Sequence, residues 1–128
     1  MKDIIKISPD NKRAKALKEM AKERYSTIND FKMPYRIIEE YYEIIKELLT
    51  AFMYKDGQKT LSHKSLIDFA RKNIKFLSTT EIELIDNLRV KRNNIVYYGE
   101  KISTEFLKYR EQIIKKIIDL LIKNLICN

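Results

Sequence analysis

One stretch decides the fold: residues 34–55 read PYRIIEEYYEIIKELLTAFMYK. Its apolar residues recur at steps of three and four, the spacing that keeps side chains on one face of an α-helix. The stripe is wider than a coiled-coil seam and comprises Ile38, Tyr41, Ile45, Leu48 and Phe52, with Ile37, Ile44 and Ala51 beside them. The sequence therefore predicts a long helix, buried on two sides, that Pro34 opens and Asp56-Gly57 ends.

A basic helix is predicted before this one, over about residues 9–29. Ser8 has the side chain of an N-cap, and Pro9 suits the first helical position, where a backbone N–H is not needed. Its apolar positions fall at helical spacing and are Ala14, Leu17, Ala21 and Ile28. We expect a moderately amphipathic helix that ends before Pro34.

Two shorter patterns follow residue 57. Ser62 can cap a third helix, and Ser78 with Glu81 has the spacing of a capping box for a fourth. Gly99 is the only other glycine after Gly57 and should close the fourth helix. The apolar residues of these helices are Leu66, Ile67, Phe69 and Ala70, and then Ile82, Ile85 and Leu88.

A fifth helix should start at Ser103 or Thr104. Its predicted face carries Phe106, Tyr109, Ile113, Ile117, Leu120 and Asn124. Five helices joined by short loops bury their stripes best as an all-α, up-and-down helical bundle of four core helices plus one short helix, for which we take the third. A chain of 128 residues suits a single domain, 1–128, with the basic helix at about 9–29 and the core bundle at about 34–125.

Several classes of protein are excluded by composition. His63 is the only histidine, and there is no Cys-x-x-Cys pair and no glycine-rich phosphate loop, so we expect neither a metal nor a cofactor. Cys127 is the only cysteine, which rules out an intramolecular disulfide and fits a reducing compartment. Charged residues interrupt every apolar run, and residues 1–5 lack the apolar stretch of a signal peptide. We expect a cytoplasmic protein without a membrane span.

The chain is strongly basic. Lys and Arg number 26 against 18 Asp and Glu, a formal net charge of +8 at pH 7. Such a charge favours an acidic partner such as RNA, DNA, nucleotide phosphates or an acidic protein. Lysine-rich helix faces that are simply solvated give the same composition, so charge alone does not choose among these.

The most unusual segment is residues 89–99, which read RVKRNNIVYYG. If Ile85, Leu88 and Ile95 form a buried stripe, the same spacing places Arg92 on it, where a cation needs a carboxylate, a phosphate or a partner subunit. A polar ridge lies beside this stripe and consists of Asp86, Arg89, Asn93 and Tyr97. The alternative is that Arg92 pairs with a buried carboxylate while Tyr97 and Tyr98 pack in the core.

In these features the chain resembles the HEPN family, the helical domains found beside minimal nucleotidyltransferases and in RNA-cleaving toxins of toxin–antitoxin systems. Three features carry the likeness in order: the long apolar second helix, the stretch GQKTLSHKSLI at residues 57–67, and Arg92-Asn93 followed by IVYYG at residues 95–99. Together they cover about residues 10–125. The resemblance implies a helical bundle and a homodimer in which the motifs of two subunits face each other across a cleft.

Family members that cut RNA carry an Arg-x4–6-His motif, usually with a polar residue after the arginine. Arg92 and Asn93 match its first two elements, and Tyr97 or Tyr98 stands where the histidine would be. Metal-independent cleavage needs a base, an acid and a cation over the transition state, and a tyrosine of ordinary pKa is a poor base at neutral pH.

Three functions remain open. The leading one is a binding module with a cleft formed by Arg89, Arg92, Asn93, Tyr97 and Tyr98, which would hold a nucleotide, an RNA phosphate or a nucleotidyltransferase partner. The second is a weak or degenerate endoribonuclease of toxin type with Arg92, Asn93 and Tyr97 as catalytic residues. The third is a structural oligomerisation domain, which would need Arg92 to be satisfied within one subunit.

Overall fold

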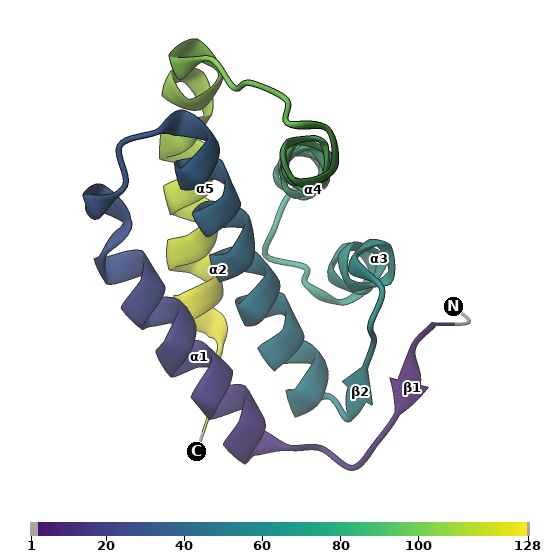
Figure 1. Ribbon diagram of the computed structural model, residues 1–128. Coiled ribbons are helices and arrows are strands. Elements are labelled where there is room, and N and C mark those ends of the chain that lie inside the picture. The colour runs from purple at the N-terminus through teal and green to yellow at the C-terminus, as the bar shows by residue number, and fades with distance from the viewer. Residues whose placement is uncertain (1–2, 128) are drawn as a thin grey trace.

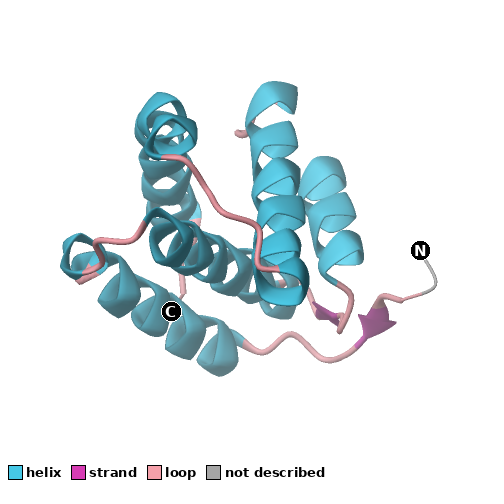
Figure 2. Ribbon diagram, turned by 45° about the horizontal axis from the view of Figure 1, so that its top comes forward, coloured by secondary structure: helices cyan, strands magenta, loops and turns pink. Residues whose placement is uncertain are grey.

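The computed structural model describes residues 3–127 and confirms the all-α helical bundle. Five α-helices and one pair of two-residue strands follow in chain order (Figure 1): β1 (Ile5–Lys6), α1 (Asn11–Ser26), a 3-10 turn (Ile28–Asp30), α2 (Pro34–Lys55), β2 (Gln58–Lys59), α3 (His63–Asn73), α4 (Thr79–Tyr98) and α5 (Thr104–Asn124). Helices α1, α2 and α5 run roughly along one direction, and α3 and α4 cross them (Figures 1 and 2).

Helix α2 is the centre of the bundle and packs against each of the other four helices. The predicted stripe is largely buried, with Ile38, Tyr41, Ile45 and Leu48 removed from solvent. Phe52 is only partly buried. The prediction that this helix is buried on two sides is thus confirmed, because α1 covers one side and α3, α4 and α5 cover the others (Figure 1).

Helix α1 begins two residues later than predicted. Its N-cap is Asp10, whose carboxylate accepts a hydrogen bond from the backbone N–H of Arg13 at 2.9 Å, and not Ser8. Ser8 and Pro9 lie outside any helix or strand, in the link between β1 and α1. The helix ends at Ser26, before the predicted limit of residue 29, and the chain then makes a separate 3-10 turn.

The segment before α1 is held by a small ribbon that the sequence did not predict. Strand β1 pairs with β2 in an antiparallel register that places Ile5 opposite Lys59. The pairing continues with a 2.8 Å hydrogen bond from Ile7 N–H to the carbonyl of Gly57. Gly57 has φ +74°, and a Cβ there would lie 2.7 Å from the carbonyl oxygen of Ile7. This position therefore needs glycine for its backbone angle and for the close approach.

The remaining helix ends follow the predicted capping residues. Ser62 caps α3, Ser78 and Glu81 form the capping box of α4, and Ser103 caps α5. Gly99 closes α4 in the left-handed conformation, with φ 65°. Helix α3, with 11 residues, is the shortest of the five described helices, as predicted.

Two predicted faces need correction. The buried face of α5 is turned by one position from the predicted one and consists of Leu107, Ile114, Ile117, Ile118 and Leu121. Tyr109 is consequently 74% exposed, and Ile113 is also exposed. In α4, burial ends after Leu88, and Ile95 is only partly covered. The reason is that α4 packs mainly on α2 and α3, so its second half extends past the core.

Within residues 3–127, no helix is both long enough and apolar enough to span a bilayer.

Candidate functional site

Arg92 lies in the second half of α4 and is half-buried. Its guanidinium donates a long hydrogen bond of 3.4 Å to the side-chain oxygen of the adjacent Asn93. Across the described residues, no carboxylate comes within ion-pair distance of it. Within residues 3–127 the charge of Arg92 is therefore uncompensated, although burial makes an unpaired cation unfavourable.

The cations around Arg92 are paired, in contrast. Arg89 bonds Asp86 at 2.8 Å within α4, and Lys91 bonds Glu100 at 3.1 Å across the end of the helix. On the facing helix α2, Lys46 pairs with Glu43 at 2.7 Å. Arg92 thus differs from these three cations because, among the described residues, it has no carboxylate partner.

A further titratable side chain, His63, comes from the start of α3. Its Nδ1 lies 3.1 Å from the hydroxyl of Tyr42, and the two rings are 5.7 Å apart. Tyr42 comes from the middle of α2 and is only 1% exposed, so its hydroxyl needs a hydrogen-bonding partner. His63 is the first residue of α3, directly after the N-cap Ser62, and this tertiary contact fixes its ring against α2.

The pKa values link the histidine to the arginines. Burial lowers the pKa of His63, and the positive charges of Lys46, Arg92 and Arg89 lower it further, against the opposing charge of Glu43. Burial also raises the pKa of Tyr42 to about 12, while Arg89 and Arg92 oppose that rise. The charges of both arginines therefore reach both rings. We refer to Tyr42, His63, Arg89 and Arg92 as the α2–α4 cluster.

A pocket of about 310 Å³ opens beside the cluster where α2 meets α3. His63, Ser62 and Thr60 line it from the β2–α3 side, and Glu43 and Lys46 line it from α2. Its wall also includes the carboxylate of Glu47 and the side chains of Leu17, Leu61 and Leu66, and no residue of α4 lines it.

The two tyrosines after Arg92 do not pack in the core. Tyr97 is 69% exposed and Tyr98 is 83% exposed, so the interpretation that buried them is wrong. Among the predicted site residues, Arg89, Arg92 and Asn93 lie together, whereas Tyr97 and Tyr98 project from the end of α4. The member that sequence reasoning missed is His63, because residues that meet across three helices leave no local pattern.

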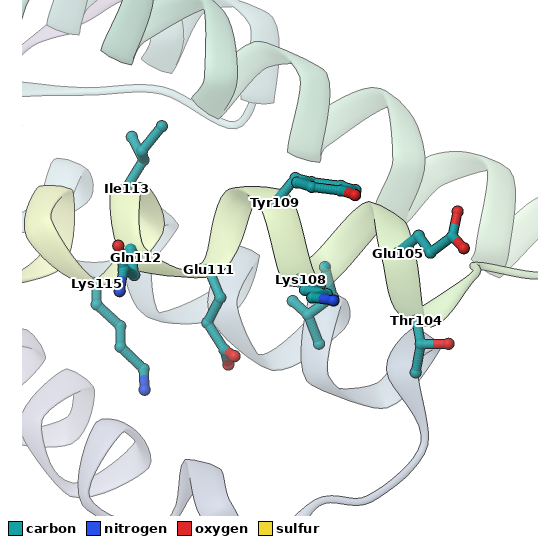
Figure 3. Close-up of a pocket in the computed structure, with 9 residues that line it drawn as sticks. Thr104, Glu105, Lys108, Tyr109, Glu111, Gln112, Ile113 and Lys115 are labelled. Atoms are coloured by element: carbon teal, nitrogen blue, oxygen red, sulfur yellow. The ribbon is translucent and has the colours of Figure 1, made fainter.

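A larger hollow, about 850 Å³, runs along the first half of α5 (Figure 3). Tyr109 and Ile113 point to one side of this helix, and Glu111 and Lys115 point to the other (Figure 3). Glu111 is already engaged, because it accepts a 2.6 Å hydrogen bond from Tyr41. The hollow has exposed apolar surface, but its polar groups do not converge on one point, so it is the weaker site for chemistry.

Within residues 3–127, no three His, Cys, Asp or Glu side chains gather where they could hold a metal ion. Fold and site together define an all-α bundle with an Arg-His-Tyr cluster between three of its helices. Comparison of the chain with protein families, with curated proteins and with solved structures finds no match.

Proposed function

We propose that this chain is a HEPN-like binding module, working as a cytoplasmic homodimer, whose cleft around Arg92 holds the phosphate of a nucleotide or of RNA. The observation that carries the proposal is the half-buried guanidinium of Arg92, which has no carboxylate partner among the described residues. A phosphate would supply the missing negative charge, and two of its oxygens could accept the two parallel N–H donors of the guanidinium. The net charge of +8 supports the same class of ligand.

The test compares two single substitutions for binding of a fluorescent single-stranded RNA. Arg92→Ala should weaken binding about tenfold and reduce the slope of log affinity against log salt by about one, the loss of one phosphate contact. Lys115→Ala is the matched control, because Lys115 is also partly buried but lies on α5. Circular dichroism should show both variants folded. Equal losses of RNA affinity in both variants would mean that the net positive charge attracts RNA without a defined binding site.

The acidic surface of a minimal nucleotidyltransferase is the other partner that the HEPN resemblance implies. It would engage the same guanidinium through carboxylates. If RNA and nucleotides fail to bind while an acidic peptide binds in an Arg92-dependent manner, the partner is a protein and the phosphate proposal is wrong.

A homodimer is part of the proposal because the second half of α4 and the first half of α5 expose apolar side chains. Val96, Tyr97, Tyr109 and Ile113 all belong to this exposed set. Light scattering at micromolar concentration should give twice the chain mass of 15.4 kDa. A monomer at high micromolar concentration would contradict the shared cleft.

One observation favours a second candidate function, a weak metal-independent endoribonuclease. The only histidine of the sequence lies within reach of the charge of Arg92, although it stands outside the Arg-x4–6-His motif. An imidazole could move the proton of a 2′-hydroxyl, and Arg92 could stabilise the charge of the transition state. RNA cleavage that persists in EDTA and disappears in Arg92→Ala would place this function ahead of binding.

Tyr97→His also tests the endoribonuclease function, because it restores the histidine of the Arg-x4–6-His motif. A histidine five positions after Arg92 restores the family spacing, so this variant should create or raise RNA cleavage, by as much as about 10²–10⁴-fold for acid–base help. The added substitution Arg92→Ala should remove that gain. A folded, dimeric Tyr97→His protein without activity on varied RNAs would leave Arg92 with a binding or structural role.

A further inference from the structure

A pocket of about 510 Å³ lies at the end of α4 and is lined by the start of α2, the last turn of α4 and the link from α4 to α5. We infer that this pocket binds the base of a nucleotide whose phosphate lies against Arg92. The inference rests on the proposed function and names the part of the ligand that a phosphate site alone leaves out. It depends on three features: the apolar walls of the pocket, its charge and its position on α4.

The walls of the pocket offer apolar surface to a flat ring. Met33, Ile95 and Ile102 contribute apolar side chains, and Tyr35 contributes an aromatic ring. Met33 is 54% exposed and Tyr35 is 40% exposed, so the pocket is open to solvent. Nucleobases stack on aromatic side chains, and a volume of about 510 Å³ lies within the range of sites for small molecules. A base can therefore enter from the surface and cover these side chains.

The charged groups of the pocket favour an anionic ligand. Glu100 contributes a carboxylate to the wall, but it is already engaged by the ammonium of Lys91 at 3.1 Å and by the side-chain amide of Asn94 at 3.3 Å. Lys101 also lines the pocket, and no carboxylate among residues 3–127 lies within ion-pair distance of it. No side chain caps the first turn of α2, so its dipole adds positive potential. The pocket therefore combines apolar walls with a net positive charge.

Arg92 lies on the same face of α4 as the pocket wall. Ile95 and Gly99 both line the pocket and follow Arg92 by three and seven positions, the steps that return to one face of a helix. At a rise of about 1.5 Å per residue, they lie about 4.5 Å and about 10.5 Å farther along the helix axis. The base and the phosphate of a nucleotide are separated by a ribose, a spacing of about one helical turn. A base in the pocket therefore leaves its phosphate within reach of the Arg92 guanidinium.

A nucleotide satisfies both parts of this site, whereas simpler ligands satisfy one. An uncharged apolar molecule would leave Arg92 and Lys101 without counter-charges, and a bare phosphate would leave the apolar walls in contact with water. The carboxylate of Glu100 could also accept a hydrogen bond from an amino group of a base. The nucleotide is either free or part of single-stranded RNA, because the bases of a duplex are stacked and paired and cannot enter a pocket.

The experiment titrates the isotope-labelled protein, followed by NMR, with adenosine 5′-monophosphate, adenosine and ribose 5-phosphate. The monophosphate should bind about tenfold more tightly than either fragment, because it engages the pocket and Arg92 together. Adenosine and the monophosphate should both shift the backbone amides of Gly99 and Ile102, which line the pocket.

Met33→Trp tests the pocket by filling it. This variant should weaken the binding of adenosine monophosphate about tenfold and leave ribose 5-phosphate unchanged, because a base on an aromatic ring contributes a factor of that order. Met20→Trp is the matched control, because Met20 is a methionine of similar exposure on α1, at 48%. Arg92→Ala should do the converse of Met33→Trp, weakening both phosphate-bearing probes about tenfold and leaving adenosine unchanged.

A fluorescent single-stranded RNA distinguishes the two sources of the nucleotide. Tighter binding of RNA than of adenosine monophosphate, with the same loss in Met33→Trp, would identify a base of a strand, and the reverse order would identify a free nucleotide. Either order supports the pocket.

Three other results would contradict the proposals, and they can be told apart. If adenosine monophosphate binds in an Arg92-dependent manner but Met33→Trp leaves its affinity unchanged, this inference is wrong and the proposed function stands. Equal affinities for adenosine and its monophosphate would overturn the ligand class. Absence of binding by RNA and by all three probes would instead overturn the proposed function itself.

Discussion

The two halves of α4 differ in the interactions that their side chains make with the rest of the bundle. The first half is capped by Ser78 and Glu81 and buries Ile82, Ile85 and Leu88. The second half contains Arg92 without a carboxylate partner among the described residues, and ends in two exposed tyrosines. Capping and burial explain these residues of the first half, but neither explains the guanidinium and the aromatic rings of the second. The proposed binding site would account for this contrast.

The largest effect should come from the core of the first half. Leu88→Ala removes a fully buried side chain and should lower the free energy of unfolding by about 2–5 kcal/mol. Val96→Ala in the exposed second half should change it by about 0.5 kcal/mol or less. Urea unfolding followed by circular dichroism measures both. Similar losses would show that the second half is packed after all, as in a dimer that persists during unfolding.

The next effect is a pH dependence of stability. It comes from His63 on α3, whose pKa is influenced by the arginines of α4. Since the pKa of His63 is lowered by folding, the unfolded chain binds more protons below about pH 6.5, and stability should fall as pH drops through that value toward the folded pKa. A single proton limits the slope to about 1.4 kcal/mol per pH unit. Urea midpoints between pH 7.5 and 5.5 should show this slope in the wild type and lose it in His63→Gln. A slope that persists in His63→Gln would assign it to other groups.

A smaller effect is expected at the capped end. Ser78→Ala removes the side-chain acceptor for Glu81 N–H and should reduce stability by about 1 kcal/mol. Thr80→Ala is the control, because Thr80 lies in the same first turn but is exposed and makes no capping bond. A loss from Thr80→Ala as large as that from Ser78→Ala would mean that helix propensity, and not the cap, is being measured.

The smallest change in stability should come from the exposed end. Tyr97→Ala and Tyr98→Ala should each alter the unfolding free energy of the monomer by less than about 0.5 kcal/mol. If the second half of α4 is the dimer face, the same variants should shift sedimentation equilibrium toward the monomer. Unchanged self-association would separate these tyrosines from the interface.

The parts of the fold that sequence predicted well are local. Capping by Ser62, Ser78 and Ser103, and closure by Gly99, depend on side chains within a few residues of the backbone groups they satisfy. The stripe of α2 was predictable for a similar reason, because its spacing alone fixes which positions share a face.

The predictions that were wrong or incomplete depend on contacts between elements far apart in the sequence. On α5, Phe106 and Leu107 are both apolar, so sequence could not decide which of two neighbouring faces would meet α2. The candidate site was half predicted, since the spacing pointed to Arg92 but could not bring His63 beside Tyr42 from another helix. The start of α1 was missed because Ser8 and Asp10 are both good N-caps, and pairing of Ile7 with Gly57 selects the later one.

The ribbon between β1 and β2 also sets an order of events during protein synthesis. Ile5 finds its partner only after Lys59 has been made, roughly 3–11 s later at ribosomal speeds of about 5–20 residues per second. In that interval the first strand has an unpaired edge. Because it is only two residues long and carries Lys6, it offers other nascent chains a poor template for pairing.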